Sequence, residues 1–199
     1  MTPEEEKRFE EIQGKYCSNS RSGKSRNPSR MGTRLVQNVH EALPYFKEYI
    51  NVPVLDVGCG DGLGLEIFKQ EGFPVWGVEV VEDRVTTAHS YDLTTVKKGT
   101  AEDLSEFEEK SVNVFCSHTL EHCKDQAKAV KEIQRVAKNL IWILVPIEFK
   151  LKSANIAHFS PIASLEQIRN YFGVDVWHVV RYMYRSNLEA EGLIVFERR

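Results

Sequence analysis

The chain has 199 residues, of which 42% are hydrophobic and 28% are charged, and its formal net charge is −3. This length suits one domain, or one domain with an extension, and it is sufficient for a sizeable core. The small net negative charge argues against a protein that binds polyanions over its whole surface. The longest apolar run, from Leu140 to Ile147, is too short to span a bilayer.

The amino-terminal residues and the cysteines bear on the cellular compartment. Residues 1–6 are acidic where a secretory signal would be basic and then apolar, so we expect a cytoplasmic protein. The cysteines form no C-x-x-C pair and no regular framework, so we expect reduced thiols and no metal site. They are Cys17, Cys59, Cys116 and Cys123.

Two segments precede the main domain. Residues 2–14 begin with a proline and glutamates and end at a glycine, which predicts a short helix. Residues 15–30 contain five basic residues, no acidic one and many helix breakers, which predicts a flexible arm. A solvated linker is the favoured interpretation, and contact of the basic arm 15–34 with nucleic acid is the alternative. We therefore divide the chain into a helix and arm, 1–30, and a main domain, 31–199.

The main domain opens with a helix and then alternates strands with helices. Apolar residues at helical spacing from Met31 to Ile50 predict a helix over one edge of a sheet, which Pro44 would kink or split in two. The alternation that follows predicts a three-layer α/β domain with right-handed crossovers and a final antiparallel pair. The predicted strands are 52–57, 74–80, 95–98, 112–117, 140–145, 174–182 and 192–196, and the helices among them are 63–71, 82–90, 125–138 and 164–171.

The first predicted strand runs directly into a glycine-rich turn, because residues 54–64 read VLDVGCGDGLG. Alternate glycines let the backbone adopt positive φ and let a ligand approach the main chain closely. A turn of this kind, at the carboxyl end of a strand and before a helix, is where open α/β sheets bind ligands. The G-x-G-x-x-G dinucleotide fingerprint is not met, because Leu63 stands where its third glycine would be. Asp56 suits a ligand that has cationic groups and no pyrophosphate.

Two later strand ends also carry polar residues. Glu79 ends the second predicted strand, where a carboxylate can accept hydrogen bonds from both hydroxyls of a ribose. The fourth predicted strand leads into His118 and His122. Their H-x-x-x-H spacing lacks the glutamate of the zinc motif H-E-x-x-H, so zinc is not predicted.

The glycine-rich segment resembles motif I of the class I S-adenosylmethionine-dependent methyltransferases, in particular their small-molecule, type 11-like subgroup. The resemblance extends over about residues 52–172. It implies a three-layer α/β/α Rossmann-like methyltransferase fold with a seven-stranded, mostly parallel sheet in the order 3-2-1-4-5-7-6 and strand 7 antiparallel. It also implies S-adenosyl-L-methionine as the cofactor and S-adenosyl-L-homocysteine as the product.

The resemblance further implies which residues contact the cofactor. The segment after the third strand would meet the adenine ring, and the choice between Glu102 and Asp103 for its amine stays open. Ser117 and His118 would lie beside the sulfonium. The implied cofactor-binding residues are Asp56, Gly58, Cys59, Gly60, Gly62, Glu79, Val80, Thr100, Ala101, Glu102, Ser117 and His118.

Residues 117–122, S-x-x-L-E-H, and residues 158–160, H-F-S, resemble segments that the same subgroup places around the methyl acceptor. The candidates for a general base are, in order, His122, His158 and Glu148, because a histidine titrates near neutral pH. His122 would equally suit a buried histidine bonded to backbone, and Glu148 a solvent-facing residue.

The acceptor itself is less determined by the sequence. The chain has neither a (D/N)-P-P-(Y/F) motif nor a proline-cysteine pair, which disfavours methylation of DNA bases. An O, N or C atom of a small molecule is the expected target. A non-catalytic module that binds S-adenosylmethionine or S-adenosylhomocysteine is the first alternative, and an NAD-type oxidoreductase is the second.

Overall fold

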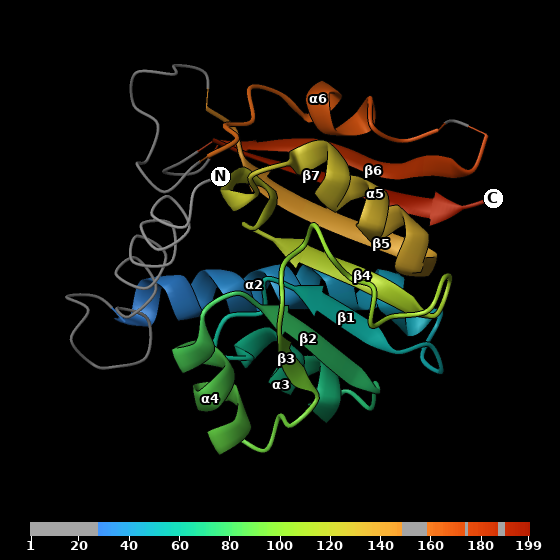
Figure 1. Ribbon diagram of the computed structural model, residues 1–199. Helices are drawn as coiled ribbons and strands as arrows, with labels where there is room; N and C mark the ends of the chain where they lie inside the picture. Colours follow the sequence, from blue (N-terminus) through green and yellow to red (C-terminus); the bar gives the residue numbers. More distant parts are fainter. Residues whose placement is uncertain (1–27, 149–158, 174, 187–189) are drawn as a thin grey trace.

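The computed structural model describes residues 28–148, 159–173, 175–186 and 190–199 (Figure 1). The predicted helix 2–14, most of the predicted arm, and His158 lie outside the described residues. The 1–30 and 31–199 division stays a prediction.

A seven-stranded sheet in the order β3-β2-β1-β4-β5-β7-β6 forms the centre of the protein (Figure 1). Neighbouring strands are parallel except for β7, which is antiparallel to both β5 and β6. The predicted strand order and the antiparallel seventh strand are therefore confirmed. The strands are β1 (Val54–Val57), β2 (Val75–Glu79), β3 (Val96–Lys98), β4 (Val112–Ser117), β5 (Ala137–Pro146), β6 (Trp177–Ser186) and β7 (Ala190–Arg198).

Helices cover both faces of the sheet, which gives the predicted three layers. The first three described helices share one apolar cluster with one face of the sheet, and the last two share another cluster with the opposite face. The helices are α2 (Pro28–Lys47), α3 (Leu63–Gln70), α4 (Glu82–Ser90), α5 (Gln126–Val136) and α6 (Leu165–Arg169), with a single 3₁₀ turn, η1 (Leu120–His122).

Helix α2 corrects two expectations. It is one helix from Pro28 to Lys47, so the predicted split at Pro44 does not occur. The prediction that it covers an edge of the sheet is wrong, because α2 contacts α3 and the central strands β4 and β5. The physical reason is aromatic packing: Phe46 of α2 is fully buried, and its ring centroid lies 6.5 Å from that of Phe115 in β4.

Side-chain caps mark the starts of two helices. Ser164 accepts a hydrogen bond from the Gln167 amide at the start of α6, and Asp125 accepts one from the Lys128 amide at the start of α5. Strand β5 begins at Ala137, immediately after α5 ends at Val136, so no loop separates the two.

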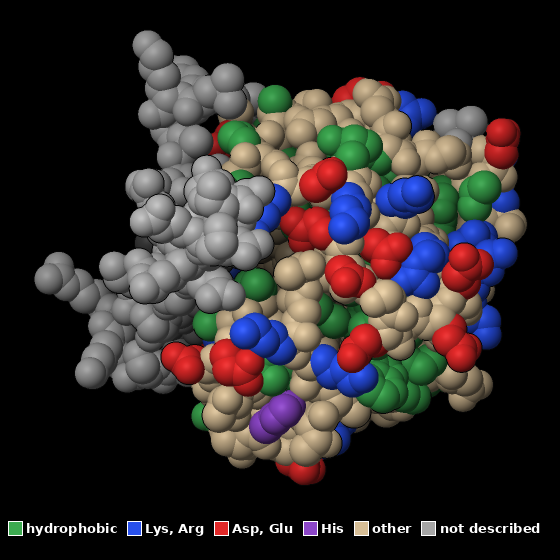
Figure 2. All heavy atoms as spheres, in the orientation of Figure 1, with side chains coloured by type: hydrophobic (Ala, Val, Ile, Leu, Met, Phe, Trp, Pro, Cys, Tyr) green, Lys and Arg blue, Asp and Glu red, His purple; other side chains and the backbone are tan. Residues whose placement is uncertain are grey.

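The surface carries charges of both signs, as the similar numbers of acidic and basic residues in the sequence lead one to expect. Acidic and basic side chains are interspersed over the face drawn in Figure 2. No helix within the described part of the chain is both long and apolar enough to cross a membrane.

Candidate functional site

The carboxyl ends of β1, β2 and β4 lie side by side in the sheet, so polar residues that follow them share one edge. Four acidic side chains are buried among the described residues. Three lie on or just after β1, β2 and β4, and the fourth lies at the start of β7, which is antiparallel and so begins at the same edge. Buried carboxylates are costly unless hydrogen bonds or positive charges compensate them, so their concentration indicates a functional site. They are Asp56, Glu79, Glu121 and Glu191.

The glycine-rich turn is held tightly against its neighbours. Gly58 has φ of 79°, and its amide donates to the carbonyl of Val78 over 2.8 Å. A Cβ built on Gly58 would lie 2.2 Å from Oγ1 of Thr119, whose hydroxyl donates to the carbonyl of Val57. Both the backbone conformation and the close packing therefore require glycine at position 58.

Two backbone amides fix the carboxylate of Glu79. Its Oε2 accepts from the Gly60 amide and its Oε1 from the Val81 amide, each over 2.9 Å. Arg84, in the first turn of α4, reaches the same carboxylate, with 4.0 Å between Nη1 and Oε2. Its Nε also lies 3.8 Å from Oδ1 of Asp61. The Glu79 carboxylate is thus held in one orientation over the glycine turn.

Asp56 is a buried acid at the end of the first strand. Burial, and then repulsion from Glu79, raise the pKa of its carboxyl to about 8. A cationic group bound beside it would lower this pKa again and stabilise the ionised form. Asp56 therefore suits a positively charged ligand.

His118 follows β4 in a left-handed conformation, with φ of 54°. Its Nε2 lies 3.0 Å from Oε1 of Glu191, and its Nδ1 lies 3.5 Å from Oε1 of Glu121. Burial alone lowers the pKa of this imidazole, but the two glutamates outweigh it and raise the pKa to about 9. Arg34 of α2 also pairs with Glu191. His118 is consequently an imidazolium near neutral pH.

A family model described as a methyltransferase domain matches residues 55–143. The ubiquinone biosynthesis O-methyltransferase of Hydrogenovibrio crunogenus is 30% identical over 157 residues, which make up 75% of this chain and 64% of that protein. The chain is thus similar to class I S-adenosylmethionine-dependent methyltransferases in sequence and in fold. It spans less than two thirds of the length of the curated relatives it matches, since a second such enzyme, from Hahella chejuensis, is 35% identical over only 38% of its length.

Solved structures show the same methyltransferase fold. The magnesium protoporphyrin IX methyltransferase of Synechocystis PCC 6803, solved with bound S-adenosylhomocysteine, has a TM-score of 0.67 at 15% identity and covers 85% of this chain and 84% of its own. A SAM-dependent methyltransferase from Archaeoglobus fulgidus has a TM-score of 0.68 at 21% identity, over 83% of this chain and 94% of its own. The fold expected from the resemblance is therefore confirmed.

The fold brings the predicted cofactor residues to one sheet edge, although not all of their side chains are exposed there. The Cys59 side chain is buried. Its Sγ lies against β2, where a Cβ built on Gly77 would come within 2.7 Å of it. Oε1 of Glu102 accepts from the Lys124 amide over 2.8 Å. Asp103 is exposed and accepts from the Ser105 amide, and no helix follows it.

The predicted acceptor residues are only partly described. His122 is half-buried in η1, with 3.9 Å between its Nε2 and Oε1 of Glu121. The backbone amide of Glu148 donates to the carbonyl of Ile162, just past the end of β5. His158 lies outside the described residues, whereas Ser160 donates through its amide to the carbonyl of Glu121. Ser160 therefore lies against η1.

Four charged residues of this candidate site were not predicted from the sequence. The sequence carried a signal for two of them. Glu121 belongs to the S-x-x-L-E-H segment, and Arg84 lies five residues after Glu79. The other two carried no such signal, because Glu191 meets His118 from 73 positions away and Arg34 meets Glu191 from 157 positions away.

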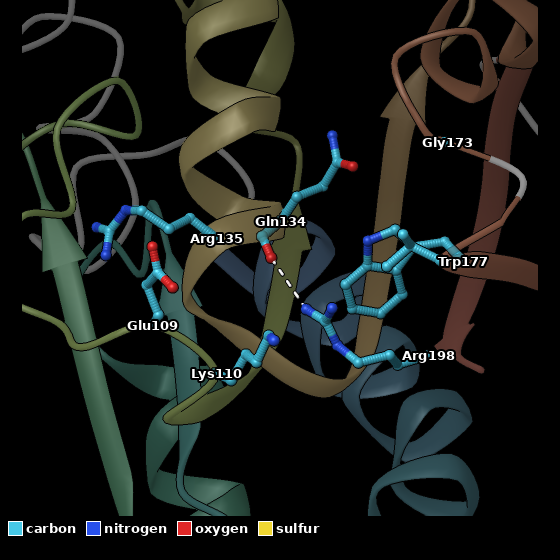
Figure 3. A pocket seen from close by; sticks show the side chains of 8 residues that line it. Glu109, Lys110, Gln134, Arg135, Gly173, Trp177 and Arg198 are labelled. Carbon is cyan, nitrogen blue, oxygen red and sulfur yellow. Dashed lines mark hydrogen bonds between the residues drawn. The ribbon is translucent and has the colours of Figure 1, made fainter.

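A separate hollow of about 320 Å³ lies at the opposite, amino-terminal edge of the parallel strands. Figure 3 shows Arg198 against the ring of Trp177, with its guanidinium donating to the carbonyl of Gln134. Arg198 thereby satisfies carbonyl groups at the end of α5, which is a structural role. None of the predicted site residues lines this hollow.

Proposed function

We propose that this chain transfers the methyl group of S-adenosylmethionine to a hydroxyl oxygen of a small molecule. One observation carries the proposal: the four buried carboxylates lie around the glycine turn and the end of β4. Such a lining suits a ligand with cationic groups and ribose hydroxyls, because carboxylates bind both. Oxygen as the methylated atom is supported by the O-methyltransferase relatives, with nitrogen and carbon as alternatives.

The chain's own residues would hold the cofactor at neighbouring strand ends. Asp56 would face its cationic groups, Glu79 would accept from its ribose hydroxyls, and Ala101 with Glu102 would border its adenine. The glycine turn suits a ligand that lies against the main chain, since Gly58 has no room for a side chain. When bound, S-adenosylmethionine supplies an activated methyl group for an in-line displacement.

On the acceptor side, His122 is our first candidate for the general base, followed by His158 and Glu148. The buried Glu121 carboxylate, 3.9 Å from Nε2 of His122, would stabilise the imidazolium that forms when His122 takes a proton from the acceptor. His118 suits that role poorly, because its pKa of about 9 keeps it protonated near neutral pH. It would instead contribute a fixed positive charge beside the site.

A small molecule is the acceptor we favour, and contact of the basic arm 15–34 with nucleic acid stays the less favoured partner. The cytoplasm stays the predicted location of the protein.

Turnover would test the proposal directly. The purified protein is incubated with S-adenosylmethionine and a panel of phenols, catechols and aliphatic alcohols, and formation of S-adenosylhomocysteine is measured. We expect turnover with at least one hydroxylated compound. Glu79→Gln should lower kcat/KM by about tenfold to a hundredfold, since it removes a charged hydrogen-bond acceptor. Glu108→Gln, an exposed position, is the matched control and should leave kcat/KM unchanged.

Other results would point elsewhere. Binding of S-adenosylhomocysteine without turnover on any acceptor would support the non-catalytic module. Binding of NAD in place of both cofactor forms would support the oxidoreductase. Unchanged turnover in both His122→Ala and His158→Ala would remove these histidines as bases.

A further inference from the structure

Arg84 lies directly over the glycine turn. A Cβ built on Gly60 would approach its Nη1 to 2.9 Å and its Cζ to 3.8 Å, so the guanidinium occupies the space above this glycine. The side chain of Arg84 is mostly buried, at 17% exposure. It comes from the first turn of α4, which begins three residues after Glu79.

The charges around Arg84 hold it in that place. Its guanidinium lies between two acids, 3.8 Å from Asp61 and 4.0 Å from Glu79, and the side chains of both acids are at most 10% exposed. Ion pairs shielded from water in this way are stronger than exposed ones. Arg84 is therefore an electrostatically held side chain, and moving it costs free energy.

Glu79 does not need Arg84 to keep its position. Backbone amides of Gly60 and Val81 each donate to one of its two oxygens over 2.9 Å. Two charge-assisted hydrogen bonds to fixed main-chain groups orient a carboxylate on their own. Removal of the guanidinium should therefore leave the carboxylate in place and open the space above it.

We propose that Arg84 competes with the cofactor's ribose for the space over Gly60 and for the Glu79 carboxylate, and so limits cofactor affinity. The inference rests on the proposed function, in which Glu79 accepts from the ribose hydroxyls. Binding of the ribose then includes the displacement of Arg84 from its two acids. A chain without this guanidinium binds the nucleoside part of the cofactor more tightly.

Calorimetric titration of three ligands tests this. They are S-adenosylmethionine, S-adenosylhomocysteine and the uncharged fragment 5′-deoxy-5′-methylthioadenosine, which contains the ribose and lacks the amino-acid end. In Arg84→Met we expect the Kd of all three to fall by about tenfold. In Arg84→Lys, which keeps a charge without the planar fork, we expect a smaller fall of about threefold.

Arg169→Met is the matched control, because Arg169 also pairs with a glutamate but is exposed on α6. Its Kd values should equal those of the wild type. If Arg84→Met does not fold, as judged by circular dichroism, the Arg84→Lys titration decides.

Three results would overturn the inference: unchanged affinity, weaker affinity, or a gain confined to S-adenosylmethionine. The last would mean that Arg84 acts through the charge of the sulfonium and not through the ribose. Failure of the cofactor assignment looks different, since the wild type and every variant would then bind none of the three ligands, and failure of methyl transfer alone would appear as binding without turnover. A wild type that binds while Arg84→Met gains nothing refutes only the role of Arg84.

Discussion

Asp56 ties the stability of the protein to pH. Burial and the neighbouring Glu79 raise the pKa of its carboxyl from 3.8 to about 8. The folded protein keeps this proton over a pH range in which the unfolded chain has already released it. Because the folded state binds more protons there, the free energy of unfolding falls as pH rises, by at most about 1.4 kcal/mol per pH unit.

Asp56→Asn should remove this dependence. Between about pH 4.5 and about pH 6, below the range in which His118 titrates, the wild type should lose up to about 2 kcal/mol and the variant much less. Urea unfolding at both pH values measures the difference. Asp92→Asn, at an exposed position, should behave as the wild type. If the free energy of unfolding of Asp56→Asn fell as steeply with pH as that of the wild type, the raised pKa of Asp56 would be contradicted.

At the scale of elements, one charged cluster joins α2, β4 and β7. Arg34 of α2 pairs with Glu191 of β7, and Glu191 also bonds His118 at the end of β4. The pKa of His118 is raised from 6.5 to about 9 in the folded state. Its contribution to stability is therefore complete below about pH 6.5 and is lost as pH rises through about 9.

Glu191→Gln should lower the pKa of His118, because one of the two carboxylates that hold its proton is gone. An NMR titration of the His118 ring protons, assigned with His118→Gln, measures the shift. Glu197→Gln, on the same strand, should leave the titration of His118 as it is. If the His118 ring titrated at the same pH in the wild type and in Glu191→Gln, the effect of Glu191 on the pKa of His118 would be contradicted.

The packing of α2 makes a second prediction about elements. Phe46 is fully buried, and its ring lies 5.0 Å from that of Phe68 and 6.5 Å from that of Phe115. Phe46→Ala should cost about 3 to 5 kcal/mol of unfolding free energy, because it leaves a cavity between α2, α3 and β4. Ile50→Ala, at an exposed position, should cost less than about 1 kcal/mol. Similar losses in the two variants would argue against this placement of α2.

For the whole molecule, ligand binding should raise the unfolding temperature. A ligand at a hundred times its Kd stabilises the folded state by about 2.7 kcal/mol, which corresponds to about 5 to 10 °C for a chain of this size. We expect this shift with S-adenosylmethionine and with S-adenosylhomocysteine, but not with NAD. A shift with NAD alone would refute the assignment of the cofactor.

Much of the fold follows from local sequence patterns. The predicted bounds of α4 and β4 match the structure residue for residue, because apolar runs and polar breaks mark both clearly. Strand order followed from the resemblance carried by the glycine-rich segment, and the sheet has that order. The place of α2 did not follow, because an apolar stripe shows that a helix packs without showing against which strands.

The candidate site, like the fold, followed only in part from the sequence. The sequence by itself determined the glycine turn, with Asp56 before it and Glu79 at the next strand end, because strand ends and positive φ are properties of neighbouring residues. Only the tertiary structure decided that His118 meets Glu191, 73 positions away, and that Arg84 lies over Gly60. Such contacts depend on how α2, α4 and β7 pack around the sheet, and the charges that they bring together are therefore invisible in any single stretch of the chain.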